Sequence, residues 1–133
     1  MTRASVDIGP GLEDFAAERY GADGRPIPFY DVDHRGASSV YCSAHDLLRF
    51  GLFHLKQLPP EARAPLSGAT LDLMHTPAAD RNNGRPPASG YGLGWVIDDT
   101  ALGPQFSHAG GMAGTVAQLV LVPAEGIAIA AMA

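Results

Sequence analysis

Apolar and polar positions alternate over the last third of the chain, and this alternation predicts β-structure. Two apolar runs, 115–122 and 126–132, are separated by turn residues at 123–125. A period of two places successive side chains on opposite faces of a strand. The second run is apolar on both faces, which is typical of a central strand covered on both sides. The sequence therefore predicts a hairpin that ends in a central strand.

Another strand is predicted upstream of this hairpin, over residues 91–97. The alternation places four of its side chains on one face: Tyr91, Leu93, Trp95 and Ile97. The acidic pair and the Gly-Pro pair within residues 98–104 are expected to turn the chain back. Residues 76–90 are rich in Pro, Gly and Asn, and they predict a long loop without regular structure.

The clearest predicted helix begins after Ser43. The Ser43 hydroxyl can cap the first turn, and the Asp46 carboxylate suits the positive end of the helix. Pro59 is expected to end the helix. The apolar positions that would face a core are Leu47, Leu48, Phe50, Leu52 and Leu55. Their spacing predicts a helix that is buried on one face.

Two shorter helices are also predicted. One is capped by Ser67 and stops before Pro77. Its inward positions are Leu71 and Met74, with Leu73 as a further candidate. The other rests on the helical spacing of apolar residues over 12–20. Residues 1–11 are small and polar around a Gly-Pro-Gly run, and we expect them to be a flexible lead-in.

Length and composition are those of a globular domain. The chain has 133 residues, which is one domain at most, with 46% hydrophobic and 17% charged residues. The net charge of −5 argues against nucleic acid or an anionic membrane as a partner. No apolar run approaches the ~18 residues of a membrane span, and no secretory leader is recognised. The lone cysteine leaves the redox compartment open.

Metal and cysteine chemistry are weakly supported. Asp31, Asp33 and His34 offer metal-ligand side chains, but no further His or Cys completes a spaced set. A solvated acidic loop is the favoured interpretation, and no metal or cofactor is predicted. Cys42 paired with a histidine base is an alternative nucleophile, although a lone Cys next to a helix cap is more often buried filler. His54 is interpreted as a core or surface histidine.

The stretch Phe-Ser-His-Ala-Gly-Gly-Met-Ala-Gly, residues 106–114, has the strongest functional pattern. Glycines next to a histidine at a strand edge let a ligand approach closely, and bare N–H groups there can stabilise a developing negative charge. The competing interpretation is a glycine-rich hairpin loop that carries one surface histidine. The pattern alone leaves both open.

Three blocks in this order resemble the serine β-lactamase and penicillin-binding-protein-like family, in its class C and esterase branch. They are Ser-Ser-Val-Tyr-Cys-Ser-Ala-His-Asp-Leu-Leu-Arg-Phe at 38–50, Tyr-Gly-Leu-Gly-Trp at 91–95 and Ser-His-Ala-Gly-Gly-Met-Ala-Gly at 107–114. The likeness runs from about residue 15 to the end of the chain. It implies an α+β fold in which helices pack on an antiparallel sheet, as in part of a β-lactamase or transpeptidase domain. It also implies that residues 15–20 are extended, which conflicts with the helix that their spacing predicts.

The resemblance also implies a site. His108 matches the Lys or His of the family's third motif, which orients an anionic group of the substrate. Gly111 would supply an N–H for half of an oxyanion hole. Ala109, Gly110 and Tyr91 would line the substrate, with Gly110 keeping the strand edge accessible. The substrates of the family include β-lactams, D-alanyl peptides and short-chain esters or amides, which are opened through an acyl-enzyme.

The family's nucleophile motif, Ser-x-x-Lys, is absent. The single lysine, Lys56, is preceded three places earlier by Phe53. The second motif of the family, Tyr-x-Asn, is also absent, because none of the four tyrosines has Asn two places on. We therefore expect residues 1–133 to be one partial domain, the C-terminal part of a β-lactamase-like domain, inactive alone. Its expected partners are a small-molecule substrate in the complete protein and the missing N-terminal part, or a second copy, through exposed strand edges. The alternatives are a non-catalytic interaction module that pairs through a β edge, and a truncated product without function.

Overall fold

The computed structural model describes residues 3–7, 13–30, 32, 34–78 and 89–133. Parts of the predicted lead-in and of the predicted 76–90 loop lie outside these residues. Within the lead-in, β1 (Ala4–Ser5) pairs antiparallel with β2 (Tyr41–Cys42). None of the helices in the described ranges is both long enough and apolar enough to span a membrane.

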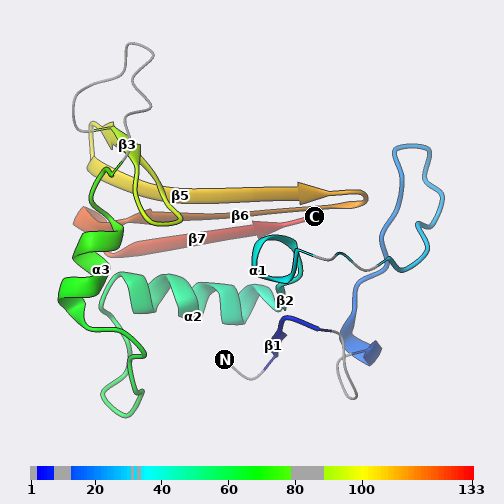
Figure 1. The fold of residues 1–133 in the computed structure, drawn as a ribbon, viewed down its shortest axis with the longest axis horizontal. Coiled ribbons are helices and arrows are strands. Elements are labelled where there is room, and N and C mark those ends of the chain that lie inside the picture. The colour runs from blue at the N-terminus through cyan, green and yellow to red at the C-terminus, as the bar shows by residue number, and fades with distance from the viewer. Residues whose placement is uncertain (1–2, 8–12, 31, 33, 79–88) are drawn as a thin grey trace.

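A five-stranded antiparallel sheet dominates the fold, with its strands in sequence order (Figure 1). Its strands are β3 (Gly90–Tyr91), β4 (Val96–Thr100), β5 (Gly103–Met112), β6 (Thr115–Val122) and β7 (Ile127–Met132). The 3-10 turn η2 (Pro123–Glu125) joins the last two strands, and Gly126 closes it in the left-handed conformation. The predicted 115–122 and 126–132 hairpin is thus confirmed, and so is the α+β class.

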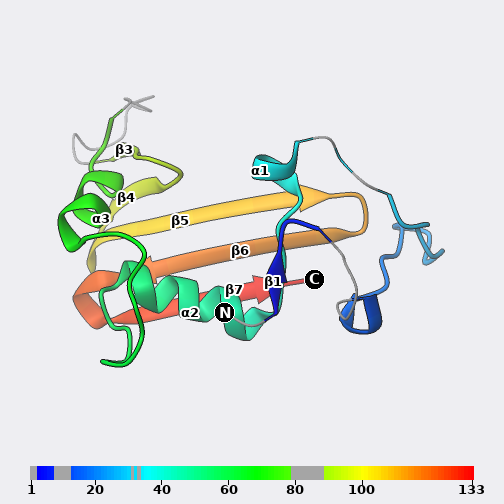
Figure 2. The ribbon, with the colours of Figure 1, turned by 60° about the horizontal axis from the view of Figure 1, so that its bottom comes forward.

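Helix α2 (Ala44–His54) covers one face of the sheet by packing along β6 and β7 (Figure 2). The close approach occurs at Gly51, where an added Cβ would lie 3.0 Å from Ala128 and 3.1 Å from Leu121. A small residue lets the helix backbone come this near, and the side chains around it form the core. The core members are Trp95, Leu119 and Leu121, flanked by Leu47, Leu55, Met74, Phe106, Ala128 and Ala130.

The predicted cap of α2 is confirmed, and its acidic partner has a further role. The Ser43 hydroxyl accepts from the Asp46 N–H at 3.1 Å. The buried Asp46 carboxylate accepts from the backbone N–H of Arg3 at 2.6 Å, and the Ser43 N–H donates to the Arg3 carbonyl at 3.1 Å. The first turn of the helix is therefore tied to the segment that carries β1.

Helix α2 ends earlier than predicted. It stops at His54, five residues before Pro59, and Lys56 just beyond it adopts a φ of 60° that is incompatible with a helix. Helix α3 (Gly68–Met74) follows, with Ser67 as the predicted cap, and lies at the end of the sheet where β5 begins (Figure 1). Leu71 is buried as predicted, whereas Leu73 is 62% exposed and does not face the core.

Two short helical elements precede α2. The predicted helix over 12–20 is wrong for its described part, which contains only the 3-10 turn η1 (Glu13–Phe15). Tyr20 instead pairs with Pro26, and the Ile27 N–H donates to the Arg19 carbonyl at 2.8 Å. Strand-like pairing satisfies these backbone groups where helical bonds do not. Helix α1 (Arg35–Ser38) is a single turn that the sequence pattern did not predict.

The predicted single strand over 91–97 is a hairpin. Tyr91 pairs with Val96 across it, and the Gly92 N–H donates to the Trp95 carbonyl at 2.8 Å. The reversal is possible because Gly94 has a φ of 79°, which side-chain-bearing residues rarely adopt. Leu93 is consequently 52% exposed instead of sharing the buried face. The acidic pair predicted as part of the next turn lies within β4.

Strand β7 is at the edge of the described sheet instead of at its centre. Ile127 and Ile129 are 46% and 54% exposed on the face away from α2. Ala128 and Ala130 are the residues that pack against the core. The apolar character on both faces was correctly read from the sequence, but the second face is uncovered among the described residues.

We predict that Gly92→Ala destabilises the fold by about 1–3 kcal/mol, since its Cβ would lie 2.1 Å from the Met74 carbonyl oxygen. That oxygen also accepts from the Leu93 N–H at 3.0 Å, so the backbone cannot retreat without losing this bond. Urea unfolding followed by Trp95 fluorescence measures the change. Gly36→Ala is the matched control, because its Cβ meets nothing within 4 Å. Equal midpoints for the two variants would contradict the prediction.

Candidate active site

Strand β5 has a free edge at its C-terminal half. It pairs with β4 only as far as Ser107, which lies opposite Val96. Its pairing with β6 continues to Met112, opposite Thr115. Among the described residues, no strand covers the other side of β5 beyond Ser107. Backbone groups on that side are available to an extended ligand.

The predicted site residues of the third block all lie along this free edge. His108 is opposite Leu119, and Gly110 is opposite Ala117, so these two belong to the face of the sheet that packs on α2. Ala109 and Gly111 point to the other face. All four are exposed. The interpretation as a glycine-rich loop is therefore wrong, because the stretch is a strand up to Met112.

Tyr91, the remaining predicted site residue, reaches His108 from β3. Its hydroxyl lies 3.1 Å from His108 Nε2, and the two rings meet edge to face with centroids 6.3 Å apart. No other hydrogen bond is formed by the His108 ring within the described ranges. The structure therefore joins two residues that are 17 positions apart in the sequence.

The glycines of the site are not required by the fold. A Cβ on Gly110 would meet nothing within 4 Å, and one on Gly111 would be 3.5 Å from Val116, an ordinary contact. Neither has a positive φ. By contrast, Gly114 in the following turn has a φ of 74°, and a Cβ there would be 2.8 Å from the Arg19 side chain. The fold therefore requires a glycine at Gly114 but not at Gly110 or Gly111, and the space above Gly110 is open.

The far end of β5 is held by the segment that precedes α1. The Tyr30 hydroxyl donates to the Ala113 carbonyl at 2.9 Å, and Ile27 packs against the turn at Gly114. The guanidinium of Arg19 lies over the Tyr30 ring, 4.4 Å from its centroid. The tip of the β5–β6 hairpin is thus fixed at the opposite end of the sheet from α3.

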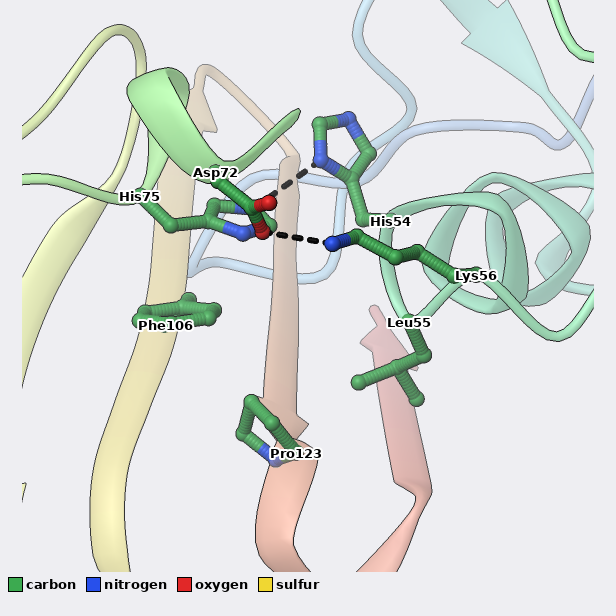
Figure 3. A pocket seen from close by; sticks show the side chains of 7 residues that line it. All are labelled: His54, Leu55, Lys56, Asp72, His75, Phe106 and Pro123. Atoms are coloured by element: carbon green, nitrogen blue, oxygen red, sulfur yellow. Dashed lines mark hydrogen bonds and ion pairs between the residues drawn. The ribbon is translucent and has the colours of Figure 1, made fainter. Parts of the chain in front are cut away.

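A second polar cluster, which the sequence did not reveal, lies at the other end of β5. His54 Nδ1 is 3.0 Å from His75 Nε2, and Lys56 bonds Asp72 at 2.6 Å beside them. Figure 3 shows these side chains around a pocket of about 360 Å³, with Leu55, Phe106 and Pro123 completing the lining. His54 is the last residue of α2 and His75 caps the end of α3, 21 positions away, so no local spacing signals their contact.

Aromatic rings enclose the histidine pair. His54 is 3% exposed and contacts the rings of Phe50, Phe53 and Trp95. Burial lowers the pKa of His54 to about 4, with a smaller contribution from His75. Burial also lowers the pKa of His75, and the nearby Asp72 partly opposes this shift. The two imidazoles are therefore neutral near pH 7, and they share a single hydrogen bond.

Metal binding and a cysteine nucleophile find little support in the described residues. The described residues contain no group of three or more His, Cys, Asp or Glu side chains placed to hold a metal ion. Burial, followed by the negative charge of Asp46, raises the pKa of the Cys42 thiol. A thiol with a raised pKa is a poor nucleophile at neutral pH, which argues against the cysteine alternative. Of the acidic loop residues, Asp31 and Asp33 lie outside the described residues.

Known proteins resemble the chain in both sequence and fold. The family model described as β-lactamase matches residues 3–133. Penicillin-binding protein 4 of Amycolatopsis lactamdurans is 31% identical over 115 residues, which are 83% of this chain and 30% of that protein. Two class C β-lactamase structures, one of a mutant, match 99% of the chain with TM-scores of 0.79 and 0.78, at 19% and 17% identity, and the matches cover 42% and 41% of those chains.

An octameric penicillin-binding protein homologue from Pyrococcus abyssi has the same fold, with a TM-score of 0.74 at 19% identity over 99% of this chain and 30% of that one. The chain belongs to the β-lactamase family, since the family model matches nearly all of it. It has the β-lactamase and transpeptidase fold, of which it spans less than half the length found in these relatives.

We predict that the free energy of unfolding decreases as the pH falls from 6.5 toward 4. In this window the unfolded chain binds protons that folded His54, with its pKa of about 4, does not. The slope is at most about 1.4 kcal/mol per pH unit for each histidine, and it vanishes above pH 6.5. Urea unfolding at several pH values measures it. His54→Gln should reduce the slope, whereas the exposed His45→Gln should not. Equal slopes in the two variants would refute the prediction.

Proposed function

We propose that this chain supplies the third-motif strand and the oxyanion-side wall of a serine hydrolase site. His108 orients an anionic group of the substrate, and the Gly111 N–H stabilises the developing oxyanion. Ala109, Gly110 and Tyr91 line the bound substrate. The free edge of β5 beyond Ser107 is the observation that carries the proposal, because an extended substrate can pair there.

The open space above Gly110 supports the same role. Glycine at Gly110 has no steric purpose in the described fold, since its Cβ position is empty. A glycine without a structural role beside an exposed histidine is what a close-fitting substrate requires. An N–H donor at the reacting oxygen is worth roughly 10²–10³ in rate when the site is complete.

The nucleophile comes from outside residues 1–133 in this proposal. The sequence lacks Ser-x-x-Lys, and its single lysine, Lys56, is engaged with Asp72 away from His108. Residues 1–133 form one partial domain, the C-terminal part of a β-lactamase-like domain. The chain alone is inactive, and the substrate of the complete protein is a β-lactam, a D-alanyl peptide or a short-chain ester or amide, opened through an acyl-enzyme.

A chimera tests this function. This chain replaces the matching 115-residue stretch of penicillin-binding protein 4 of Amycolatopsis lactamdurans, which retains its own remaining sequence. We expect the chimera to react with a fluorescent penicillin and the isolated chain to turn over neither nitrocefin nor p-nitrophenyl esters. His108→Ala should lower the acylation rate of the chimera about 10²-fold.

In the same chimera, Gly110→Ala distinguishes an effect on substrate binding from an effect on folding. Because the Cβ position is empty, we expect thermal stability to be unchanged while acylation falls. Ser43→Ala, which removes only the α2 cap, is the opposite control: it lowers stability by about 1 kcal/mol and leaves acylation intact. Turnover by the isolated chain that survived both His108→Ala and Ser43→Ala would disprove the proposed function.

The alternative function is a non-catalytic interaction module that pairs through strand β7. The exposed Ile127 and Ile129 favour it, as does the position of β7 at the sheet edge. The partner is either the remainder of the polypeptide or a second copy of the chain. An uncovered apolar strand at an edge is a common pairing site.

Self-association distinguishes this alternative. If pairing through β7 is the function, the isolated chain forms a discrete dimer, Ile129→Lys abolishes it and His108→Ala does not. Sedimentation velocity over a range of concentrations measures both effects. If the chain stays monomeric, or if its association requires His108, the hypothesis that two copies pair through β7 is excluded.

A further inference from the structure

The hydrogen bond between Tyr91 and His108 has a consequence for the chemistry of the histidine. In a neutral imidazole one nitrogen donates and the other accepts, so the position of the proton depends on whether the engaged nitrogen donates or accepts in its hydrogen bond. Here the engaged nitrogen is Nε2, at 3.1 Å from the Tyr91 hydroxyl. Nδ1 forms no hydrogen bond with any described residue, so it is the nitrogen that a ligand on the β5 edge can reach.

Tyr91 is held in place by the backbone on both sides. Its carbonyl accepts from the Ala78 N–H at 2.9 Å, and its neighbour Gly92 is packed against the Met74 carbonyl. The β3–β4 hairpin that carries it is anchored by Trp95, which is 3% exposed in the core. The hydroxyl is therefore delivered by a fixed element to a histidine that is otherwise exposed.

We propose that Tyr91 is a positioning residue for His108: its O–H donates to Nε2 and holds the neutral imidazole with its proton on Nδ1. A phenol donates readily to a neutral imidazole nitrogen, whereas a free histidine side chain favours the Nε2–H form. His108 consequently presents Nδ1–H as a donor to a carboxylate or carbonyl oxygen of the substrate. This inference rests on the proposed function for its role in catalysis, but the tautomer itself does not.

The bond also limits rotation of the His108 ring. An exposed histidine samples several rotamers, and each ring flip exchanges the two nitrogens. With Nε2 held by Tyr91 and the rings edge to face, one orientation is selected before the substrate arrives. The sequence block at 91–95 therefore contributes to the site through its first residue and to the core through its last.

The tautomer is measured by ¹⁵N chemical shifts of histidine-labelled chain in alkaline buffer, where histidine is neutral. We expect His108, assigned through His108→Gln, to have a protonated Nδ1 and an unprotonated Nε2. In Tyr91→Phe the two forms should mix, with the Nε2–H form in the majority. Tyr30→Phe is the matched control, because its hydroxyl bonds the Ala113 carbonyl at the other end of the strand and should leave His108 unchanged.

If Tyr91→Phe does not fold, the tautomer measured in the unaltered chain is the test. An Nδ1–H tautomer at His108 then supports the inference, and an Nε2–H tautomer overturns it. Unchanged His108 shifts in a folded Tyr91→Phe variant also overturn it. The amide spectrum reports folding in each case.

The penicillin-binding chimera separates this inference from the proposed function. If the chimera is acylated, Tyr91→Phe should lower the acylation rate about 10-fold and displace its pH profile, while Tyr30→Phe should do neither. Acylation that is indifferent to Tyr91→Phe overturns the positioning role and leaves the proposed function standing. Absence of acylation together with the Nδ1–H tautomer refutes the function and leaves the positioning of His108 supported.

Discussion

Strand β5 pairs with β6 over a longer stretch than with β4, and the candidate site depends on this difference. On one side, β6 pairs with the strand as far as Met112, while on the other, β4 stops opposite Ser107. Backbone N–H and C=O groups are obligatory hydrogen-bonding groups, so an unpaired stretch of strand beside a well-paired one has groups that an extended ligand can bond. His108 lies at the first position beyond the end of β4. The rest of the fold holds this edge still: α2 packs on β6 and β7, and Tyr30 fixes the hairpin tip.

The two ends of β5 are connected through the core. At its beginning, Phe106 stacks on His75 with ring centroids 4.0 Å apart, and His75 bonds His54 of α2. Trp95 contacts both histidines and belongs to the hairpin that carries Tyr91. The neutral histidine pair thus braces the helices against the hairpin. Aromatic packing of this kind places the Tyr91 hydroxyl more accurately than a loop would.

The sequence predicted much of this architecture, and its failures share a cause. The caps at Ser43 and Ser67, the last hairpin and the order of the three family blocks depend on local chemistry, which a single sequence displays. Alternation at 91–97 was misread because Gly94 permits a reversal that alternation cannot show. His75 was not recognised as a partner of His54, because their contact requires the tertiary packing of two helices. The candidate site residues were predicted from the family resemblance, whereas the bond between Tyr91 and His108 could be seen only in the structure.

The hydrogen bonds between the Arg3 backbone and the first turn of α2 make the helix depend on the beginning of the chain. The Asp46 carboxylate is 1% exposed and takes a backbone N–H from Arg3, a donor that substitution of the arginine side chain leaves in place. Trimming the chain past this residue removes one hydrogen-bond donor from a buried carboxylate, which costs stability. Recombinant versions of the protein should therefore retain Arg3.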